Sequence, residues 1–175
     1  TIPLAQVVDP KGHVYALDSD KDQLKGLSSD VEHFGVHETV TLYNTGGEAT
    51  LAPVPSNHVD GVFLFDVLQH VEDWDTLLAN CRRVLHENGK LYVNPSWISH
   101  PGEVEAERLW QRCAEHGFYQ TAEQCQRIMH YKFVREDRVL TFGRVTDFQY
   151  SVYRALQYVP AGYVTTYSML AEAAG

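Results

Sequence analysis

Apolar and polar residues follow one another in blocks that predict strands and helices in turn. Short apolar runs at 13–18, 40–43, 59–65 and 90–94 are typical of strands buried on both faces of a parallel sheet. Between these runs, apolar residues recur at helical spacing at 1–8, 24–34, 74–85 and 109–116, and a closing strand is expected at 128–135. The alternation predicts a doubly wound α/β domain that ends near residue 137.

The pattern changes after residue 137. Residues 138–146 show no clear periodicity, and we interpret them as a linker. Asp147 is placed to cap a helix that carries Phe148, Val152 and Ala155 on one side, and residues 159–162 should end that helix. A second short helix is expected at 168–174, so residues 147–175 form a small helical module.

Composition narrows the choice of partners. The 175 residues carry a formal net charge of -9, and residues 1–80 hold 13 Asp and Glu against 3 Lys and Arg. Such an acidic half is poorly suited to binding a phosphate backbone by charge. The three cysteines lack metal-ligand spacing, so we expect no metal and reduced thiols in the cytoplasm. No long apolar run or signal peptide is visible, which favours a soluble protein without membrane contact.

Asp18 is the first candidate for chemistry. It ends the apolar run at 13–18, and the carboxyl ends of parallel strands border the ligand crevice in an open α/β sheet. A carboxylate there can accept hydrogen bonds from a ribose diol, although Asp18 could instead cap the following helix. Gly46 and Gly47 likewise suit either a close backbone approach to a ligand or a plain turn.

Five segments together resemble class I S-adenosylmethionine-dependent methyltransferases over residues 1–136. They are Val14–Asp18, Gly47–Ala49, Asp60–Asp73, Arg83–Leu91 and His116–Phe118. The resemblance implies S-adenosylmethionine as cofactor and a set of residues that would bind it: Asp18 with Ser19 at the ribose, Glu48 by the adenine amino group, Ala49 through its backbone, and Phe65 with Asp66 lining the crevice. Glu48 as a solvated turn residue and Asp66 as a helix cap remain open alternatives.

One part of the family pattern is absent. The Gly-x-Gly-x-Gly loop and the strand before it are missing, and Thr1–Ala5 matches the helix that follows that loop. The resemblance therefore implies a Rossmann-like sheet without its first strand, in an N-terminally truncated domain that binds S-adenosylmethionine poorly by itself. Strands 13–18 and 59–65 should then have no strand between them, or should contact each other.

The methyl acceptor cannot be inferred from the residues. His70 is the candidate catalytic base, with a structural role at the start of a helix as the alternative. Cys81 and Cys113 could suggest a thiol acceptor, but both lie on apolar helix stripes, so core packing is the preferred interpretation.

The last 28 residues show a second resemblance. The segments 148–156 and 159–175 resemble the start of the winged-helix DNA-binding domain of O6-alkylguanine-DNA alkyltransferases and alkyltransferase-like proteins. This implies DNA as a partner, with Tyr167 pressing on the target phosphate beside Thr166 as the nucleotide rotates out. The acceptor cysteine of that family would lie beyond Gly175, so this chain cannot transfer an alkyl group. Two hypotheses follow: a methyltransferase fused to a DNA-binding module, or an alkyltransferase-like damage-binding protein with a non-catalytic appendage.

Overall fold

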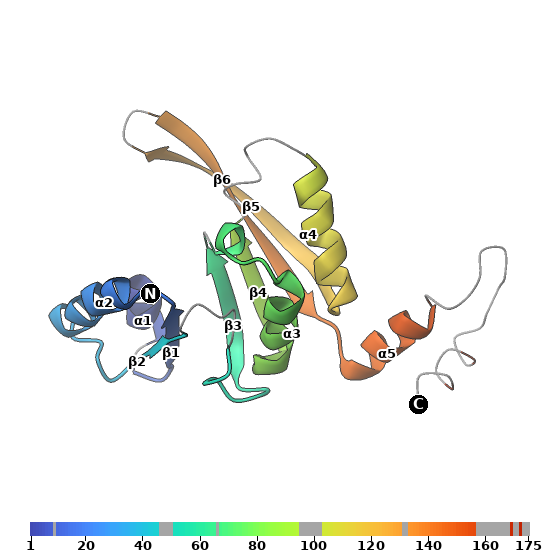
Figure 1. Ribbon diagram of the computed structural model, residues 1–175, viewed down its shortest axis with the longest axis horizontal. Helices are drawn as coiled ribbons and strands as arrows, with labels where there is room; N and C mark the ends of the chain where they lie inside the picture. Colours follow the sequence, from blue (N-terminus) through green and yellow to red (C-terminus); the bar gives the residue numbers. More distant parts are fainter. Residues whose placement is uncertain are drawn as a thin grey trace. The chain divides into compact units, whose positions relative to one another are not determined.

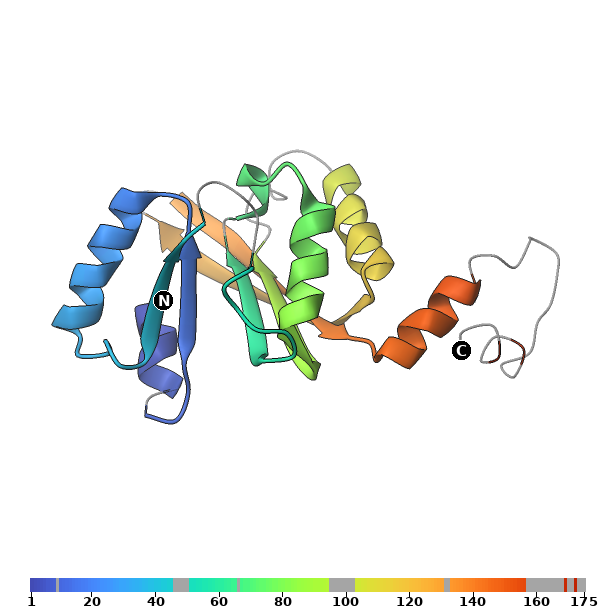
Figure 2. The ribbon, with the colours of Figure 1, turned by 60° about the horizontal axis from the view of Figure 1, so that its bottom comes forward.

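The computed structural model describes residues 1–8, 10–45, 51–65, 67–94, 103–130, 133–156, 169 and 172. The chain divides into two compact units, Thr1–Ser56 and Asn57–Gly175. Each unit has its own sheet (Figures 1 and 2). None of the described helices has the length and apolarity needed to cross a bilayer.

The first unit is a two-stranded parallel sheet with two helices. It contains α1 (Ile2–Val8), β1 (Val14–Asp18), α2 (Lys21–His33) and β2 (Val40–Asn44). β1 and β2 pair in register from Val14↔Val40 to Asp18↔Asn44, so their carboxyl ends meet. Buried small and β-branched residues from all four elements form the core: Ala5, Val14, Ala16, Val31, Val36 and Val40.

The second unit is a four-stranded mixed sheet. Its elements are β3 (Val59–Phe65), the 3-10 turn η1 (Leu68–His70), α3 (Trp74–Val84), β4 (Leu85–Asn94), α4 (Glu103–Glu115), β5 (Phe118–His130), β6 (Phe133–Arg144) and α5 (Asp147–Leu156). The strand order is β3-β4-β6-β5, with β3 and β4 parallel and β6 antiparallel to both of its neighbours.

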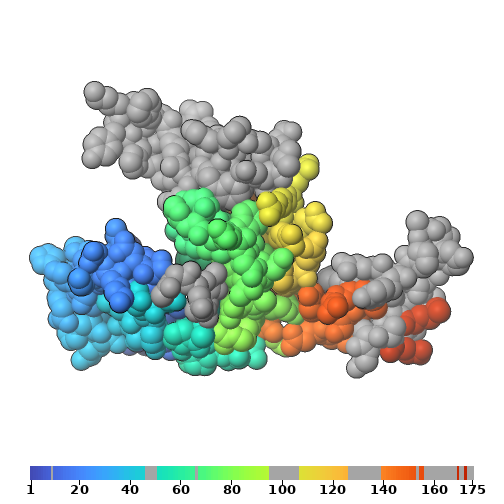
Figure 3. All heavy atoms as spheres, in the orientation of Figure 1, coloured from blue at the N-terminus to red at the C-terminus, as the bar shows by residue number. Residues whose placement is uncertain are grey.

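Helices α3 and α4 lie side by side against one face of this sheet (Figures 1 and 2). Their apolar stripes supply Leu77, Leu78, Cys81, Leu109 and Cys113, all nearly inaccessible to solvent. Arg112 of α4 and His116, directly after α4, also bind Asp75 at the start of α3, at 2.8 and 3.0 Å. The two helices are in contact in the space-filling view, where α3 is green and α4 is yellow (Figure 3).

Most predicted elements are confirmed, including the strands at 59–65 and 40–43 and the helix at 74–85, which Asp73 caps. The strand expected at 13–18 runs from Val14 to Asp18. Helix α3 ends at Val84, one residue before the end of the predicted range 74–85, because Leu85 already adopts extended backbone.

Two predictions about the chain after α4 are wrong. The closing strand expected at 128–135 is instead a hairpin of two long strands, β5 and β6. The linker expected at 138–146 is mostly β6, which pairs through residues 140–143 with β4 and along its length with β5. Polar residues dominate the outer parts of this hairpin. The sequence of β6 therefore shows little alternation of apolar and polar residues, although its backbone pairs with β4 and β5.

Both β1 and β3 are edge strands of their respective sheets. Among the described residues, no strand pairs with both of them. β1 and β3 belong to different units, so the expected gap or contact between residues 13–18 and 59–65 stays a prediction.

Candidate functional site

Asp18 ends β1 with an exposed side chain. Its Oδ1 accepts a hydrogen bond of 2.9 Å from the backbone N–H of Asp20, and its carbonyl accepts one of 2.9 Å from Thr45. The cap of α2 is Asp20, whose carboxylate accepts from the N–H groups of Asp22 and Gln23. Asp18 therefore does not cap α2, which removes the alternative reading of this residue.

Asn44 completes this end of the first sheet, and the sequence analysis missed it. It is the register partner of Asp18 on β2. Its Nδ2 donates to the carbonyl oxygens of Asp18 at 3.3 Å and Ser19 at 3.0 Å, so its side chain holds the turn that follows β1. The signal was available, because parallel strands bring their last residues to one edge and Asn44 ends the second strand.

This edge fits the ribose of the implied cofactor. A ribose diol needs an exposed acceptor with a fixed position, and Asp18 is exposed while its turn is held by Asn44 and by the bond to Asp20. A carboxylate accepts such bonds strongly because it is charged. Asp18 is thus placed to accept hydrogen bonds from a ribose, and the cofactor-binding roles of Asp18 and Ser19 stay predictions.

The carboxyl end of β3 carries the second predicted group. Phe65 is 46% exposed and lies in register with Asn94 of β4. Phe63, two residues earlier on the same face, is also exposed and packs edge-on against Phe65 and parallel to Tyr92. Phe65 belongs to the second unit and Asp18 to the first, so their common crevice stays a prediction.

Asn94 is a further residue that the sequence analysis did not single out. Its Oδ1 is buried and has no hydrogen-bond partner within the part of the chain that the structure describes. Unpaired buried acceptors are uncommon in proteins and costly. This oxygen lies at the carboxyl end of β4, next to Phe65, at the edge where open α/β sheets bind ligands.

His70 is exposed and ends the 3-10 turn η1, three residues before Asp73. Asp73, and not His70, caps α3, through bonds from the N–H and hydroxyl of Thr76 at 2.9 and 2.6 Å. His70 is therefore accessible to solvent, as a base at a crevice mouth must be. Its catalytic role remains a prediction.

The remaining predicted site residues lie outside the described part of the chain. They are Glu48, Ala49, Asp66, Thr166 and Tyr167. Cys81 and Cys113, the two cysteines on the helix stripes, are fully buried. Burial raises the pKa of both thiols, that of Cys81 to about 12. Packing in the core is their role.

Comparison with known proteins gives a family and a fold. The methyltransferase domain family matches residues 1–93. A demethylmenaquinone methyltransferase of Geobacillus stearothermophilus is 35% identical over 89 residues, which cover 51% of this chain and 37% of that protein.

Two solved structures show the same fold at low identity. The [4+2]-cyclase SpnF has a TM-score of 0.64 at 14% identity. The match covers 83% of this chain and 71% of the cyclase chain. A SAM-dependent methyltransferase from Aquifex aeolicus has a TM-score of 0.60 at 18% identity. The match covers 80% of this chain and 74% of the Aquifex chain. The fold therefore serves more than one reaction, and the sequence match carries the family assignment.

The chain spans little more than a third of the length of the curated relative it matches. The family match, by contrast, spans more than half of the chain and includes β1, β2, β3 and nearly all of β4. The chain belongs to the methyltransferase domain family, whose cofactor is S-adenosylmethionine.

Proposed function

We propose that the protein containing this chain transfers a methyl group from S-adenosylmethionine to an acceptor. The observation that carries the proposal is Asp18, an exposed carboxylate held at the carboxyl end of a parallel strand inside the family match. S-adenosylmethionine supplies a methyl group on a sulfonium, so the protein's main task is to bind and orient the two reactants. Asp18 and Ser19 would bind the ribose, and Phe65 would line the crevice.

Replacing Asp18 tests the proposal. In the whole protein, Asp18→Ala should weaken S-adenosylmethionine binding by about 1 to 3 kcal/mol, because hydrogen bonds to a charged acceptor are lost. Isothermal titration calorimetry measures this directly. Asp30→Ala is the matched control, since Asp30 is an exposed aspartate on α2 and its loss changes the net charge equally. Equal affinity in the Asp18 variant and the parent would contradict the assignment.

The acceptor is a separate question. The relatives named demethylmenaquinone methyltransferase make demethylmenaquinone the first acceptor to assay. The match to these relatives spans about half of this chain and 37% of their own length, so their acceptor is only a starting point for the assay. His70 is our proposed base for an acceptor that must lose a proton.

We also propose that residues 147–175 begin a DNA-binding module of the alkyltransferase-like kind. Support comes from the sequence pattern of 148–175 and from α5, which is a helix at the expected place. The alternative is a damage-binding protein with a non-catalytic methyltransferase-like part. It predicts DNA binding without S-adenosylmethionine binding, whereas the fused methyltransferase should bind both.

Tyr167 tests the DNA proposal. In the whole protein, Tyr167→Ala should weaken binding to duplex DNA with O6-methylguanine more than binding to the same single strand, whose bases are already unpaired. Fluorescence anisotropy with both DNAs measures the difference. An equal loss on both substrates would mean that Tyr167 supports the fold or a general backbone contact.

A further inference from the structure

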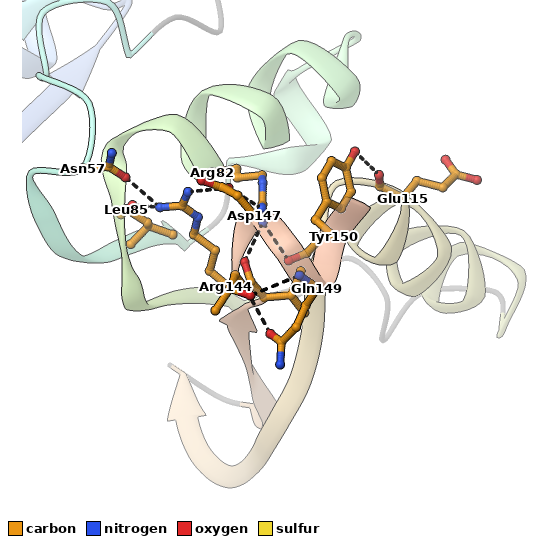
Figure 4. Close-up of polar contacts among 11 residues, drawn as sticks. Asn57, Arg82, Leu85, Glu115, Arg144, Asp147, Gln149 and Tyr150 are labelled. Carbon is orange, nitrogen blue, oxygen red and sulfur yellow. Dashed lines mark hydrogen bonds and ion pairs between the residues drawn. The ribbon is translucent and has the colours of Figure 1, made fainter. Parts of the chain in front are cut away.

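The beginning of α5 is attached to the sheet by one carboxylate and two arginines. Asp147 Oδ1 accepts hydrogen bonds from Arg82 Nη2 at 2.9 Å and from Arg144 Nη2 at 3.0 Å (Figure 4). The arginine side chains are only 12% and 5% exposed, whereas that of Asp147 is 75% exposed. The three residues come from α3, the end of β6 and the first position of α5, and we call them the Asp147 cluster.

Each guanidinium is also bonded to the sheet. Arg144 Nη1 donates to Asn57 Oδ1 at 2.8 Å and to the carbonyl of Leu85 at 2.6 Å, at the points where β3 and β4 begin. Arg82 Nη1 donates to two more backbone carbonyls at 3.1 Å, those of Gly117 and Val145. Each arginine is therefore held in place by two bonds besides the one to Asp147.

Charge makes this attachment necessary. Burial and the neighbouring Arg144 both lower the pKa of Arg82, and Asp147 opposes that shift. If Asp147 moved away, two buried like charges would face each other without an anion, which is strongly unfavourable. Solvent around the exposed carboxylate weakens the attraction between Asp147 and the two arginines, but the two arginines would still repel each other if Asp147 moved away.

A second contact fixes the direction of α5. The ring of Tyr150, one turn after Asp147, lies 4.5 Å from the Arg82 guanidinium carbon, and its hydroxyl donates to the carbonyl of Glu115 at 2.8 Å. Gly117 makes room for this arrangement, because a Cβ there would lie 2.6 Å from Arg82 Nη1. Two attachment points one turn apart determine both the position and the axis of the helix.

We propose that the Asp147 cluster is a latch that makes α5 a rigid extension of the second unit and so sets where the chain continues. The latch lies where β3 and β4 begin, at the edge opposite Phe65 and Asn94. The beginning of α5 is therefore held at the edge of this sheet that lies opposite the candidate cofactor edge. This inference is independent of the proposed function.

Hydrogen exchange of the α5 amides, followed by mass spectrometry on the full chain, tests the latch. Asp147→Ala should speed exchange of residues 147–156 by about tenfold or more, with smaller changes in α3 and β4. Formate, a small carboxylate that can take the place of the lost side chain, should restore slow exchange in the variant and leave the parent unchanged. Glu107→Gln, which removes an exposed carboxylate of α4, is the charge-matched control and should leave α5 unaffected.

Three results would overturn the latch. One is unchanged exchange in α5 of the Asp147→Ala protein. Another is exchange that rises equally throughout the second unit and does not respond to formate, which would give Asp147 a general stabilising role only. If Asp147→Ala does not fold, Asp147→Asn keeps the shape but loses the charge, and slow α5 exchange in that folded variant would equally exclude the charge-based latch.

Discussion

Two aspartates at the end of β1 have different tasks although they are only two positions apart. Asp20 accepts two N–H groups of the first turn of α2, whereas Asp18 accepts only the N–H of Asp20 and keeps an exposed carboxylate. The sequence left open which task belongs to Asp18. The side-chain positions exclude Asp18 as the cap of α2, because Asp20 accepts those N–H groups, and the ribose-binding role of Asp18 stays a prediction.

At the same scale, the three cysteines should differ in reactivity. Burial raises the pKa of Cys81 to about 12 and also raises that of Cys113, so neither forms the reactive thiolate at pH 8. Cys125 is exposed, with Sγ 3.6 Å from Glu123 Oε1. In the folded chain, Ellman's reagent should therefore modify one thiol quickly, and all three only after denaturation.

The control for that titration is Cys125→Ser. This variant should show no fast thiol in the folded state and two after denaturation. Rapid modification of two or more thiols in the folded parent chain would show that the α3 and α4 stripes are more accessible than the structure indicates.

At the scale of elements, the cap of α3 is a direct test of local structure. Asp73 binds the N–H and hydroxyl of Thr76, and these bonds lower the pKa of Asp73 below its usual value. Asp73→Ala should lower the thermal unfolding midpoint at pH 7, because the first turn of α3 loses its acceptor. Asp73→Ser, which retains a capping oxygen, should lower it less.

The pH dependence of that effect has a definite sign. Because the folded-state pKa of Asp73 is lowered, its contribution is present above the ordinary aspartate pKa of about 3.9 and is lost as the pH falls through the folded-state value. The difference in midpoint between the parent and Asp73→Ala should therefore shrink between pH 7 and pH 3. A difference that stays constant over this range would contradict an ionised cap.

The hairpin of β5 and β6 shows where element prediction fails. β5 and β6 pair from Phe118↔Arg144 to His130↔Phe133, and β6 also pairs with β4 over residues 90–93. Within residues 140–144, the part of β6 whose burial is described, Leu140 and Phe142 form a short buried alternation around Thr141. The sequence showed too little periodicity over 138–144 to predict a strand, because the stabilising partners are backbone groups that are distant in sequence.

At the scale of the whole molecule, the sheet of the second unit separates Phe65 from the beginning of α5. In the second unit, Phe65 lies at the carboxyl end of β3, and the Asp147 cluster lies where β3 and β4 begin. The first unit carries Asp18 and Asn44 at the carboxyl ends of its own strands. In each unit, the candidate ligand groups follow the rule that open α/β sheets bind ligands at the carboxyl ends of parallel strands.

The sequence by itself determined the order of strands and helices up to α4, the position of Asp18 at a strand end and the family. These depend on local periodicity, on capping residues and on motifs, all of which are contiguous in the chain. The tertiary structure alone decided that Asn44 holds the Asp18 turn, that residues 138–144 form a strand, and that Arg82 and Arg144 bind Asp147. The Asn44–Asp18 and Arg82–Asp147 contacts join residues 26 and 65 positions apart, and their energy comes from burial and charge pairing that no local pattern records.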